Sequence, residues 1–369
     1  MSTSDTPRLL VYGAYGYTGR LVVEAALDRG YDPIVAGRNT TKTRGVATAN
    51  DLQARSFPVS DADAHLGGVD AVLNCAGPFA ETADAMVDAC LETGTHYLDI
   101  TGELPVFERL RRRGPDAVDA DVTLLPGVGF DVVPTDCLAA HLHGRLPDAT
   151  HLSLAFDSDG GVSPGTLKTA LSGIGAEGAA RRDGDLRAEP IAARTRVVDF
   201  GDGLQRAVSI PWGDVSTAHH TTGIPNVYVY LSLPRSGRVV ATLVPYLGTL
   251  LDGETVQRGL SWLIDRYVEG PDASTRASGE ARVWGEVRSA DDRLVSRLRT
   301  PEPYRLTAEA ATLIAGKVLD GDAPSGYQTP ASAFGPDLVL ELDGVERVDM
   351  VEDEVVARDS SPAEGVAGD

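Results

Sequence analysis

The chain has 369 residues, 42% of them hydrophobic, which is enough to bury a sizeable core and to form two domains. Acidic residues outnumber basic ones by 54 to 33, giving a net charge of −21, and this excess argues against a nucleic acid as partner. The three cysteines show no C-x-x-C spacing, so the sequence indicates neither a disulfide framework nor a zinc knuckle. We expect no metal site.

The composition also bears on habitat. Of the basic residues only three are lysines, and an acidic, lysine-poor surface is expected of a halophilic cytoplasmic protein, because salt screens its self-repulsion. Residues 1–7 are polar and lack the cationic and apolar regions of a secretory signal, which also favours the cytoplasm.

Near the N-terminus an apolar run at 9–12 gives way to three glycines at three-residue spacing and then to an amphipathic run at 21–27. A strand that breaks into such glycines and enters a helix is typical of dinucleotide binding, with the phosphates at the free N–H groups of the helix. A purely structural glycine turn is the alternative. The predicted cofactor-binding residues of this turn are Gly13, Tyr15, Gly16, Tyr17, Thr18 and Gly19.

The end of the next expected strand, at 33–36, indicates which dinucleotide is bound. An acidic residue there suits the ribose 2′-hydroxyl of NAD, but here Gly37, Arg38 and Asn39 follow with no carboxylate. A guanidinium can pair with a 2′-phosphate, so the sequence predicts NADP(H), with Arg38 and Asn39 at the cofactor. The alternative is that Arg38 is a solvated charge at the start of a helix.

Short strands and helices then alternate, which predicts a doubly wound parallel sheet of six strands. From about residue 151 longer alternating runs at 227–233 and 281–287 indicate antiparallel strands with one covered face. The remaining expected elements are strands at 54–57, 69–74, 97–100 and 122–125, and helices near Asp63, at 81–92, 104–118 and 306–319, and after Pro330.

The predicted fold class is therefore α/β, with a Rossmann domain and a second α+β domain that has a mixed or antiparallel sheet. The apolar run at 239–251 is too short to span a bilayer, so we expect a buried helix, with peripheral membrane contact or a hydrophobic substrate wall as alternatives. The expected boundaries are 1–145 for the NADP-binding domain, 146–328 for a substrate and dimerisation domain, 329–351 for a C-terminal helix and strand that return to the Rossmann domain, and 352–369 for an acidic, disordered tail.

Ligands of an open α/β sheet bind at strand ends, so the small residues of 74–79 are expected to border the nicotinamide. Asn74 could donate to a ribose hydroxyl or the carboxamide, and Ala76 and Gly77 let the loop backbone approach. Cys75 is more simply explained by packing. After the fifth strand, Glu103 is best explained as a residue at the start of a helix, where carboxylates are favoured.

A third loop, at 126–136, crowds two glycines, two acids and two prolines between a strand and a helix. Asp131 could orient substrate or relay a proton there, whereas Thr135 or Asp136 could simply cap the helix. A second glycine-rich turn at 159–168 opens a helix and could close over substrate. The predicted catalytic residues are Asp131 and Thr166; Tyr15, Tyr17 and Thr101 are further candidates for stabilising an oxyanion or donating a proton.

Several motifs in combination resemble the saccharopine dehydrogenase-like oxidoreductases, and most closely their trans-acting enoyl reductase branch. The motifs are GAYGYTGR, AGRN, NCAGPF, HYLDITGE, GVGFDVVPTD, TGIPNV and TPASAFG. The resemblance implies an NADP-binding Rossmann domain, a second domain on the substrate side and a C-terminal helix that returns to the first. It places Gly13, Gly16, Gly19 and Arg38 at the cofactor, with Ala76 and Gly77 beside it, and transfers no catalytic residue.

The enoyl reductase branch acts on polyketide-type lipid chains, so the resemblance implies an NADPH-dependent reduction of an unsaturated, lipid-like small molecule. A homodimer through the second domain is expected. One alternative is a saccharopine-type imine or amino-acid oxidoreductase, which needs cations for carboxylates. Another is a non-catalytic NADP(H)-binding redox sensor. The arginines available for the first alternative are Arg181, Arg182, Arg187, Arg194 and Arg196.

Overall fold

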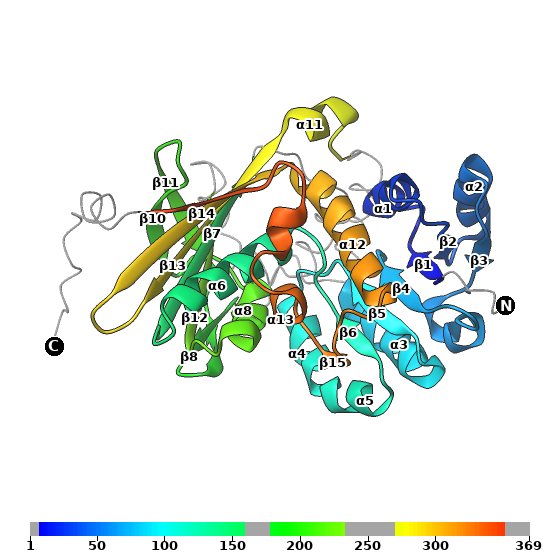
Figure 1. Cartoon of the computed structure of the whole chain (residues 1–369), viewed down its shortest axis with the longest axis horizontal. Coiled ribbons are helices and arrows are strands. Elements are labelled where there is room, and N and C mark those ends of the chain that lie inside the picture. The colour runs from blue at the N-terminus through cyan, green and yellow to red at the C-terminus, as the bar shows by residue number, and fades with distance from the viewer. Residues whose placement is uncertain (1–6, 159–177, 233–269, 351–369) are drawn as a thin grey trace, which may run out of the picture.

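The computed structural model describes residues 7–158, 178–232 and 270–350. These residues form two sheets with helices against them, as Figure 1 shows. The predicted roles of Thr166, of the apolar run at 239–251 and of the tail at 352–369 lie outside the described residues. Among the residues that are described, no helix is both long and apolar enough to cross a membrane.

The first sheet is parallel throughout, in the order β15-β6-β5-β4-β1-β2-β3. Because β1 lies between β4 and β2, the strand order reverses beside β1, and the carboxyl ends of β1 and β4 border the crevice in which such sheets bind ligands. The strands are β1 (Leu9–Tyr12), β2 (Ile34–Gly37), β3 (Ala54–Ser56), β4 (Ala71–Asn74), β5 (His96–Asp99), β6 (Thr123–Leu125) and β15 (Gly326–Tyr327).

Helices cover both faces of this sheet, because strands such as β1, β4 and β6 are buried on both sides. One face packs against α1 (Tyr17–Asp28), α2 (Thr40–Asn50) and α12 (Pro303–Leu319), and the other against α3 (Phe79–Thr93), α4 (Leu104–Arg112) and α5 (Gly114–Asp119). Single 3-10 turns occupy Val59–Asp61 and Asp63–His65, where one helix was expected.

The single helix predicted at 104–118 is in fact two, α4 and α5, which meet at Arg113. Pro115 follows Gly114 at this junction and lacks the N–H that would continue α4. Gly114 also packs against β15, where an added Cβ would lie 3.2 Å from Cβ of Tyr327. The break lets the chain pass close to the edge strand.

The second sheet is mixed and contains nine strands, of which β7 and β12 form a parallel pair. Two helices, α6 (Val133–Arg145) and α8 (Asp214–Thr222), cover its face toward the first sheet (Figure 1). The strands are β7 (His151–Ser158), β8 (Gly178–Arg182), β9 (Asp185–Glu189), β10 (Thr195–Asp199), β11 (Leu204–Ser209), β12 (Asn226–Ser232), β13 (Glu280–Arg288), β14 (Arg293–Pro301) and β16 (Glu346–Asp349).

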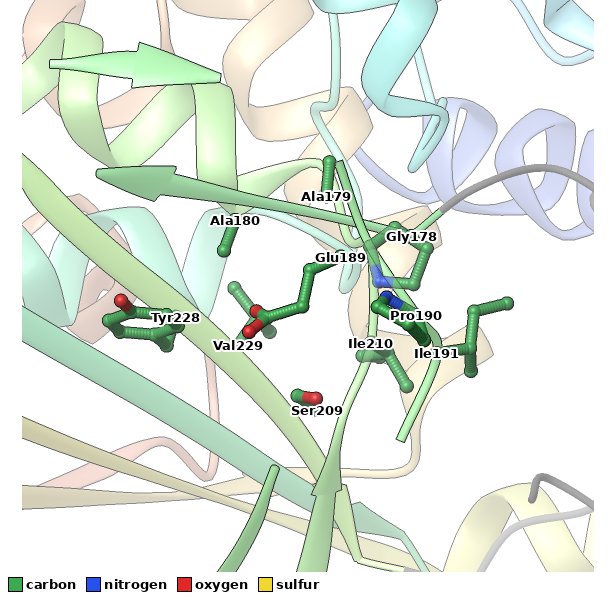
Figure 2. A pocket seen from close by; sticks show the side chains of 11 residues that line it. Gly178, Ala179, Ala180, Glu189, Pro190, Ile191, Ser209, Ile210, Tyr228 and Val229 are labelled. Carbon is green, nitrogen blue, oxygen red and sulfur yellow. The ribbon is translucent and has the colours of Figure 1, made fainter. Parts of the chain in front are cut away.

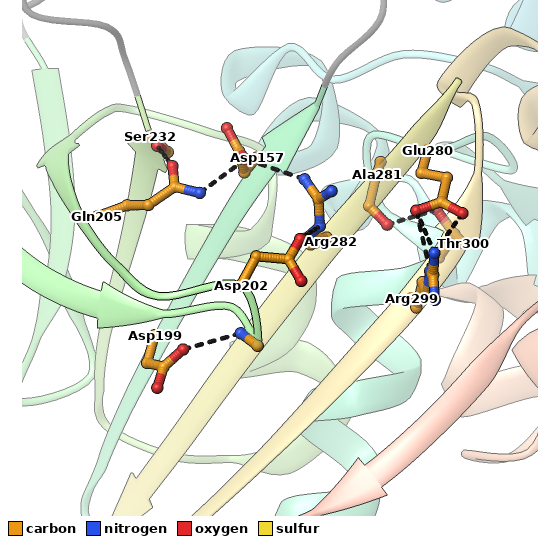
Figure 3. Close-up of polar contacts among 11 residues, drawn as sticks. Asp157, Asp199, Asp202, Gln205, Ser232, Glu280, Ala281, Arg282, Arg299 and Thr300 are labelled. Atoms are coloured by element: carbon orange, nitrogen blue, oxygen red, sulfur yellow. Dashed lines mark hydrogen bonds and ion pairs between the residues drawn. The ribbon is translucent and has the colours of Figure 1, made fainter. Parts of the chain in front are cut away.

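On the other face of this sheet the turn between β10 and β11 lies over β7 and β13 (Figure 3). Arg282 joins them, since its Nε lies 2.7 Å from Asp202 Oδ2 and its Nη1 lies 3.4 Å from Asp157 Oδ2. Gln205 donates to the same Asp157 oxygen at 3.2 Å. The contacts enclose a small core that includes Phe200, Tyr230 and Trp284.

The path of the chain between the sheets differs from the predicted boundaries. It returns to the first sheet before residue 329, because α12 packs against α1 and β15 pairs with β6. The strand predicted to return to the Rossmann domain, β16, instead pairs with β14 of the second sheet. A short helix, α13 (Pro330–Phe334), lies between these two segments and packs against α6.

Candidate cofactor and active site

The three glycines of the turn between β1 and α1 lie so close to neighbouring backbone that an added Cβ would crowd it. Gly13 has φ +82°, and its added Cβ would lie 2.9 Å from the backbone N of Ala76. A Cβ on Gly19 would lie 2.3 Å from Gly13 O, and one on Gly16 would lie 3.2 Å from the same atom. The turn is also tied to β2, because the N–H groups of Gly13 and Ala14 donate to Ala36 O. These glycines bring the start of α1 against the loop after β4.

The start of α1 fits a pyrophosphate. Its N-cap is Gly16, so no side chain among the described residues caps the first N–H groups of the helix, and its first turn holds no acid. Such free N–H groups and the positive end of the helix dipole attract phosphate. The hydroxyl of Thr18 is in the same turn and forms no hydrogen bond with any described residue.

A cationic corner lies at the end of β2. Tyr15 packs on Gly37, whose added Cβ would lie 2.6 Å from the tyrosine Cε1, and Lys42 Nζ lies 5.7 Å from the centroid of the Tyr15 ring. Arg38 is exposed and forms no ion pair within the described residues. The first turn of α2 contains no acid, and the side chain of Asn39 accepts from Lys42 N at 3.0 Å as its N-cap. The corner therefore suits a 2′-phosphate.

A buried side chain, that of Asn74, holds the loop after β4 in its conformation. Asn74 is fully buried, its Oδ1 accepts from Ala76 N at 3.0 Å, and its Nδ2 lies 3.3 Å from Tyr97 Oη and from Thr82 Oγ1. Its side chain thus positions the loop, whose backbone is exposed at Gly77 and half-buried at Ala76, so these two residues stay the predicted cofactor contacts of the loop. Burial raises the pKa of the Cys75 thiol, which agrees with packing.

The carboxylate of Glu103 caps a helix, although not the one that it precedes. Its two oxygens accept from the backbone N–H groups of Phe79 and Ala80, each at 2.8 Å, at the start of α3. The N-cap of α3 is Pro78, which has no side chain for this purpose. Glu103 therefore joins the loop after β5 to the loop after β4.

Removing this cap by Glu103→Ala is expected to lower the free energy of unfolding by about 1–2 kcal/mol, the usual worth of an N-cap. Urea denaturation at fixed salt measures it. Glu81→Ala is the matched control, because Glu81 is an exposed acid of the same first turn that caps nothing. Equal losses in the two variants would contradict the capping role.

Asp131 lies where the two sheets meet. A Cβ on Gly102, in the loop after β5, would lie 2.7 Å from Asp131 Oδ2, and Trp212 Nε1 from the second domain donates to Asp131 O at 2.9 Å. The carboxyl group itself forms no hydrogen bond with a described residue, and burial raises its pKa to about 7. A carboxyl group with this pKa can donate or accept a proton near neutral pH.

Sequence reasoning missed a buried acid behind Asp131. Asp214, at the start of α8, is completely buried, its Oδ1 lies 2.5 Å from Thr135 Oγ1, and its Oδ2 has no partner. Burial, and then the charges of Asp136 and Asp131, keep the pKa of Asp214 well above its usual range. In the sequence Asp214 simply follows Gly213, and this pattern does not indicate that the acid is buried.

Asp136 lies in the same region. Its carboxylate accepts from Thr221 Oγ1 at 2.5 Å and from Ala331 N at 2.8 Å, so it joins α6 to α8 and α13. Burial raises the pKa of Asp136 to about 6 despite these bonds. The helix cap predicted for Asp136 and Thr135 is therefore a contact between elements.

Tyr17, also predicted at the cofactor, extends from the first turn of α1 to the second domain. Its hydroxyl donates to Pro271 O at 2.5 Å and accepts from Arg276 Nη1 at 3.1 Å. Its ring meets that of Tyr304 edge to face, with 5.1 Å between centroids. The Tyr17 hydroxyl is thus hydrogen-bonded to residues of the second domain. Asp131 is therefore the better placed of these candidate proton donors.

Two hollows bordered by described residues lie in the second sheet, away from the glycine-rich turn. Figure 2 shows the first, between the β8–β9 hairpin and β12, where Glu189 points toward Ser209 and Tyr228. It holds about 10 Å³, room for a single water molecule. The second, beside Arg194 and Tyr230, measures about 380 Å³ and is mainly polar. No group of three or more candidate metal ligands gathers in the described segments.

Comparison with known proteins agrees with this geometry. Residues 9–125 match the model of the saccharopine dehydrogenase NADP binding domain. A trans-acting enoyl reductase of Mycobacterium leprae is 32% identical over 151 residues, covering 37% of this chain and 36% of that protein. A lipid droplet localized protein of Caenorhabditis elegans is 28% identical over 189 residues, covering 45% of this chain and 44% of that protein. The chain thus spans less than half the length of these relatives.

A solved structure extends the likeness to the fold. Saccharopine dehydrogenase (L-Glu forming) from Saccharomyces cerevisiae aligns with a TM-score of 0.63 at 13% identity, covering 94% of this chain and 100% of that one. The predicted Rossmann domain and second α+β domain are therefore confirmed, and the match of residues 9–125 to the NADP-binding model confirms the predicted cofactor. Residues 9–125 thus match a saccharopine dehydrogenase-type NADP-binding domain, and the chain shares the fold of saccharopine dehydrogenase.

Proposed function

We propose that this protein is an NADPH-dependent oxidoreductase that reduces an unsaturated, lipid-like substrate. The observation that carries the proposal is the glycine turn, which meets the cationic corner at Arg38 on one side and the loop that holds Ala76 on the other. This arrangement offers phosphate, ribose and nicotinamide positions along one sheet edge. The names of the relatives, an enoyl reductase and a lipid droplet protein, support the substrate class.

When bound, NADPH supplies the hydride that an activated C=C bond accepts at its β-carbon. The chain must then provide a proton to the α-carbon and exclude water from the reacting atoms. We assign the proton to Asp131, because it lies at the sheet edge, between the loop after β5 and Trp212, and its pKa of about 7 keeps much of it protonated at neutral pH.

The saccharopine-type alternative is less well supported. It requires cations that hold the carboxylates of an amino-acid adduct, yet all five candidate arginines are already paired with acids. Arg181, for example, lies 2.7 Å from Glu108 and is itself buried. Using it for substrate would leave a buried carboxylate unpaired, which is costly. The pairs are Arg181–Glu108, Arg182–Glu189, Arg187–Asp185, Arg194–Glu189 and Arg196–Glu286.

The first test is the cofactor preference. In multimolar KCl, which suits the acidic surface, purified protein is titrated with NADPH and NADH while nicotinamide fluorescence is followed. Arg38→Ala is expected to weaken NADPH binding about 10- to 100-fold, because a charged contact to the 2′-phosphate is lost, and to leave NADH binding unchanged. Arg112→Ala is the control, since Arg112 is also an exposed arginine of the same domain and forms no ion pair with a described residue.

Two results would contradict the proposal. Folded wild-type protein that binds neither nucleotide would contradict the proposed oxidoreductase activity. An Arg38→Ala variant that keeps the NADPH preference would contradict binding of the 2′-phosphate at Arg38. Turnover separates the enzyme from the redox sensor. Short and long enoyl thioesters are offered with NADPH, and tight binding without oxidation of NADPH by any of them would favour the sensor.

A further inference from the structure

Arg276 belongs to a segment of the second domain that lies against the phosphate-binding turn. The segment includes α11 (Ala273–Ser278) and approaches closely, because a Cβ on Gly270 would lie 2.8 Å from Cε2 of Tyr17. Pro271 is buried there and accepts the Tyr17 hydroxyl. The segment thus packs on the residue whose backbone N–H starts α1.

The guanidinium of Arg276 is held at this contact. Its Nη1 donates to Tyr17 Oη at 3.1 Å and to Pro271 O at 2.7 Å, and its Cζ lies 5.8 Å from the centroid of the Tyr17 ring. These hydrogen bonds use one nitrogen, so Nε and Nη2 are without a partner among the residues described. The side chain is partly buried and already ordered, which lowers the entropy lost when it binds a ligand.

The charge of Arg276 is not neutralised by contact with an acid. Hydrogen bonds at Thr275 and Ser274 lower the pKa of Asp272, with Arg276 a small further cause, whereas burial raises the pKa of Glu302 in spite of Arg276. Neither acid forms an ion pair with Arg276 in the described part of the chain. Asp272 caps α11 through Thr275 N, and Glu302 Oε2 caps α12 through the N–H groups of Tyr304 and Arg305. Many other arginines of this acidic chain do pair with a carboxylate, as Arg181 does with Glu108.

We infer that Arg276 is a cofactor-binding residue that pairs with the pyrophosphate of NADP from the side of the second domain. Its Nη1 lies 3.1 Å from the hydroxyl of Tyr17, the first residue of α1, and the pyrophosphate is expected at the N–H groups that begin this helix. A guanidinium presents two N–H groups to phosphate oxygens in a fixed geometry, which an ammonium does not. The inference rests on the proposed function and adds to it a contact that would connect both domains through the cofactor.

Calorimetric titration of the full chain tests this contact. The probes are NADPH, NADH, ADP and adenosine, because only the first three contain a pyrophosphate. Arg276→Ala is expected to weaken the first three about 10-fold each and to leave adenosine unchanged, whereas Arg38→Ala weakens NADPH alone. Arg276→Lys should recover part of the loss. Arg112→Ala again controls for removal of an exposed charge, and the unfolding midpoint of each variant reports on folding.

The outcomes are distinguishable. Wild-type protein that binds no dinucleotide overturns the proposed function and this inference together. Wild-type binding that Arg276→Ala leaves unchanged overturns the inference alone. A loss that extends equally to adenosine also overturns it, since Arg276 would then only hold the segment at 270–278 in place.

Discussion

Gly19→Ala is expected to abolish measurable NADPH binding and to lower the free energy of unfolding by about 2–4 kcal/mol. The new Cβ would lie 2.3 Å from Gly13 O and 3.0 Å from Cα of Ala14, and both neighbours are backbone atoms. Because the turn is tied to β2 through Gly13 N, α1 must move away from the sheet to relieve the overlap. Urea denaturation and NADPH titration in the same buffer measure the two effects.

Two further variants separate binding from folding. Gly45→Ala makes the same substitution at an exposed position of α2, where an added Cβ meets no described residue within 4 Å, so it should stabilise the protein by about 0.5–1 kcal/mol. Gly16→Ala adds a Cβ that meets only Gly13 O at 3.2 Å, so it should fold yet bind NADPH at least 10-fold more weakly. Normal NADPH affinity in both Gly16→Ala and Gly19→Ala would rule out this turn as the phosphate site.

Asp131→Asn is expected to lower the rate of enoyl reduction about 100- to 1,000-fold, the usual contribution of a positioned proton donor. In the wild type the rate should fall as pH rises through about 7, because the carboxyl group that donates the proton becomes ionised. The amide variant retains the shape of the side chain but has no titrating proton, so its residual rate should not show this step. Single-turnover measurements between pH 5.5 and 8.5, roughly bracketing that pKa, give both quantities.

The same substitution should raise stability at alkaline pH. Burial raises the pKa of Asp131 from the ordinary 3.8 to about 7, so the native state holds the proton more tightly than the unfolded chain. The free energy of unfolding therefore falls as pH rises between these values, by up to about 4 kcal/mol, and the loss is complete above the native pKa. Asparagine avoids this loss, so Asp131→Asn should be the more stable protein at pH 8. A variant both inactive and less stable at that pH would indicate a structural role instead.

Much of the first domain could be predicted from local pattern. The glycine spacing, the apolar strands and the end of α1 near Gly30, which has φ +81°, can each be recognised in a short continuous stretch of sequence. The missing acid after β2 likewise identified the corner at Arg38. These features depend on backbone conformation and on residues that are neighbours in the chain, which a sequence pattern captures.

The remainder depends on contacts between distant segments. Glu103 precedes α4 but caps α3, and Tyr17 reaches Pro271 and Arg276, some 250 residues away in the chain. Strand β15 has only two residues, too few for a periodic pattern. Burial of Asp214 follows from the packing of α8 on α6. Tertiary packing decides each of these, and no local propensity encodes it.

The route of the chain also determines how the protein can be dissected. After β6 it leaves the first sheet, builds most of the second, and then returns with α12 and β15 before adding β16 to the second sheet. A fragment ending at residue 145 would lack an edge strand and a helix that covers α1. The second sheet is built from two separate segments of the chain, so a graft of this domain from a relative must preserve every crossing between the sheets, including the one that leads to β16.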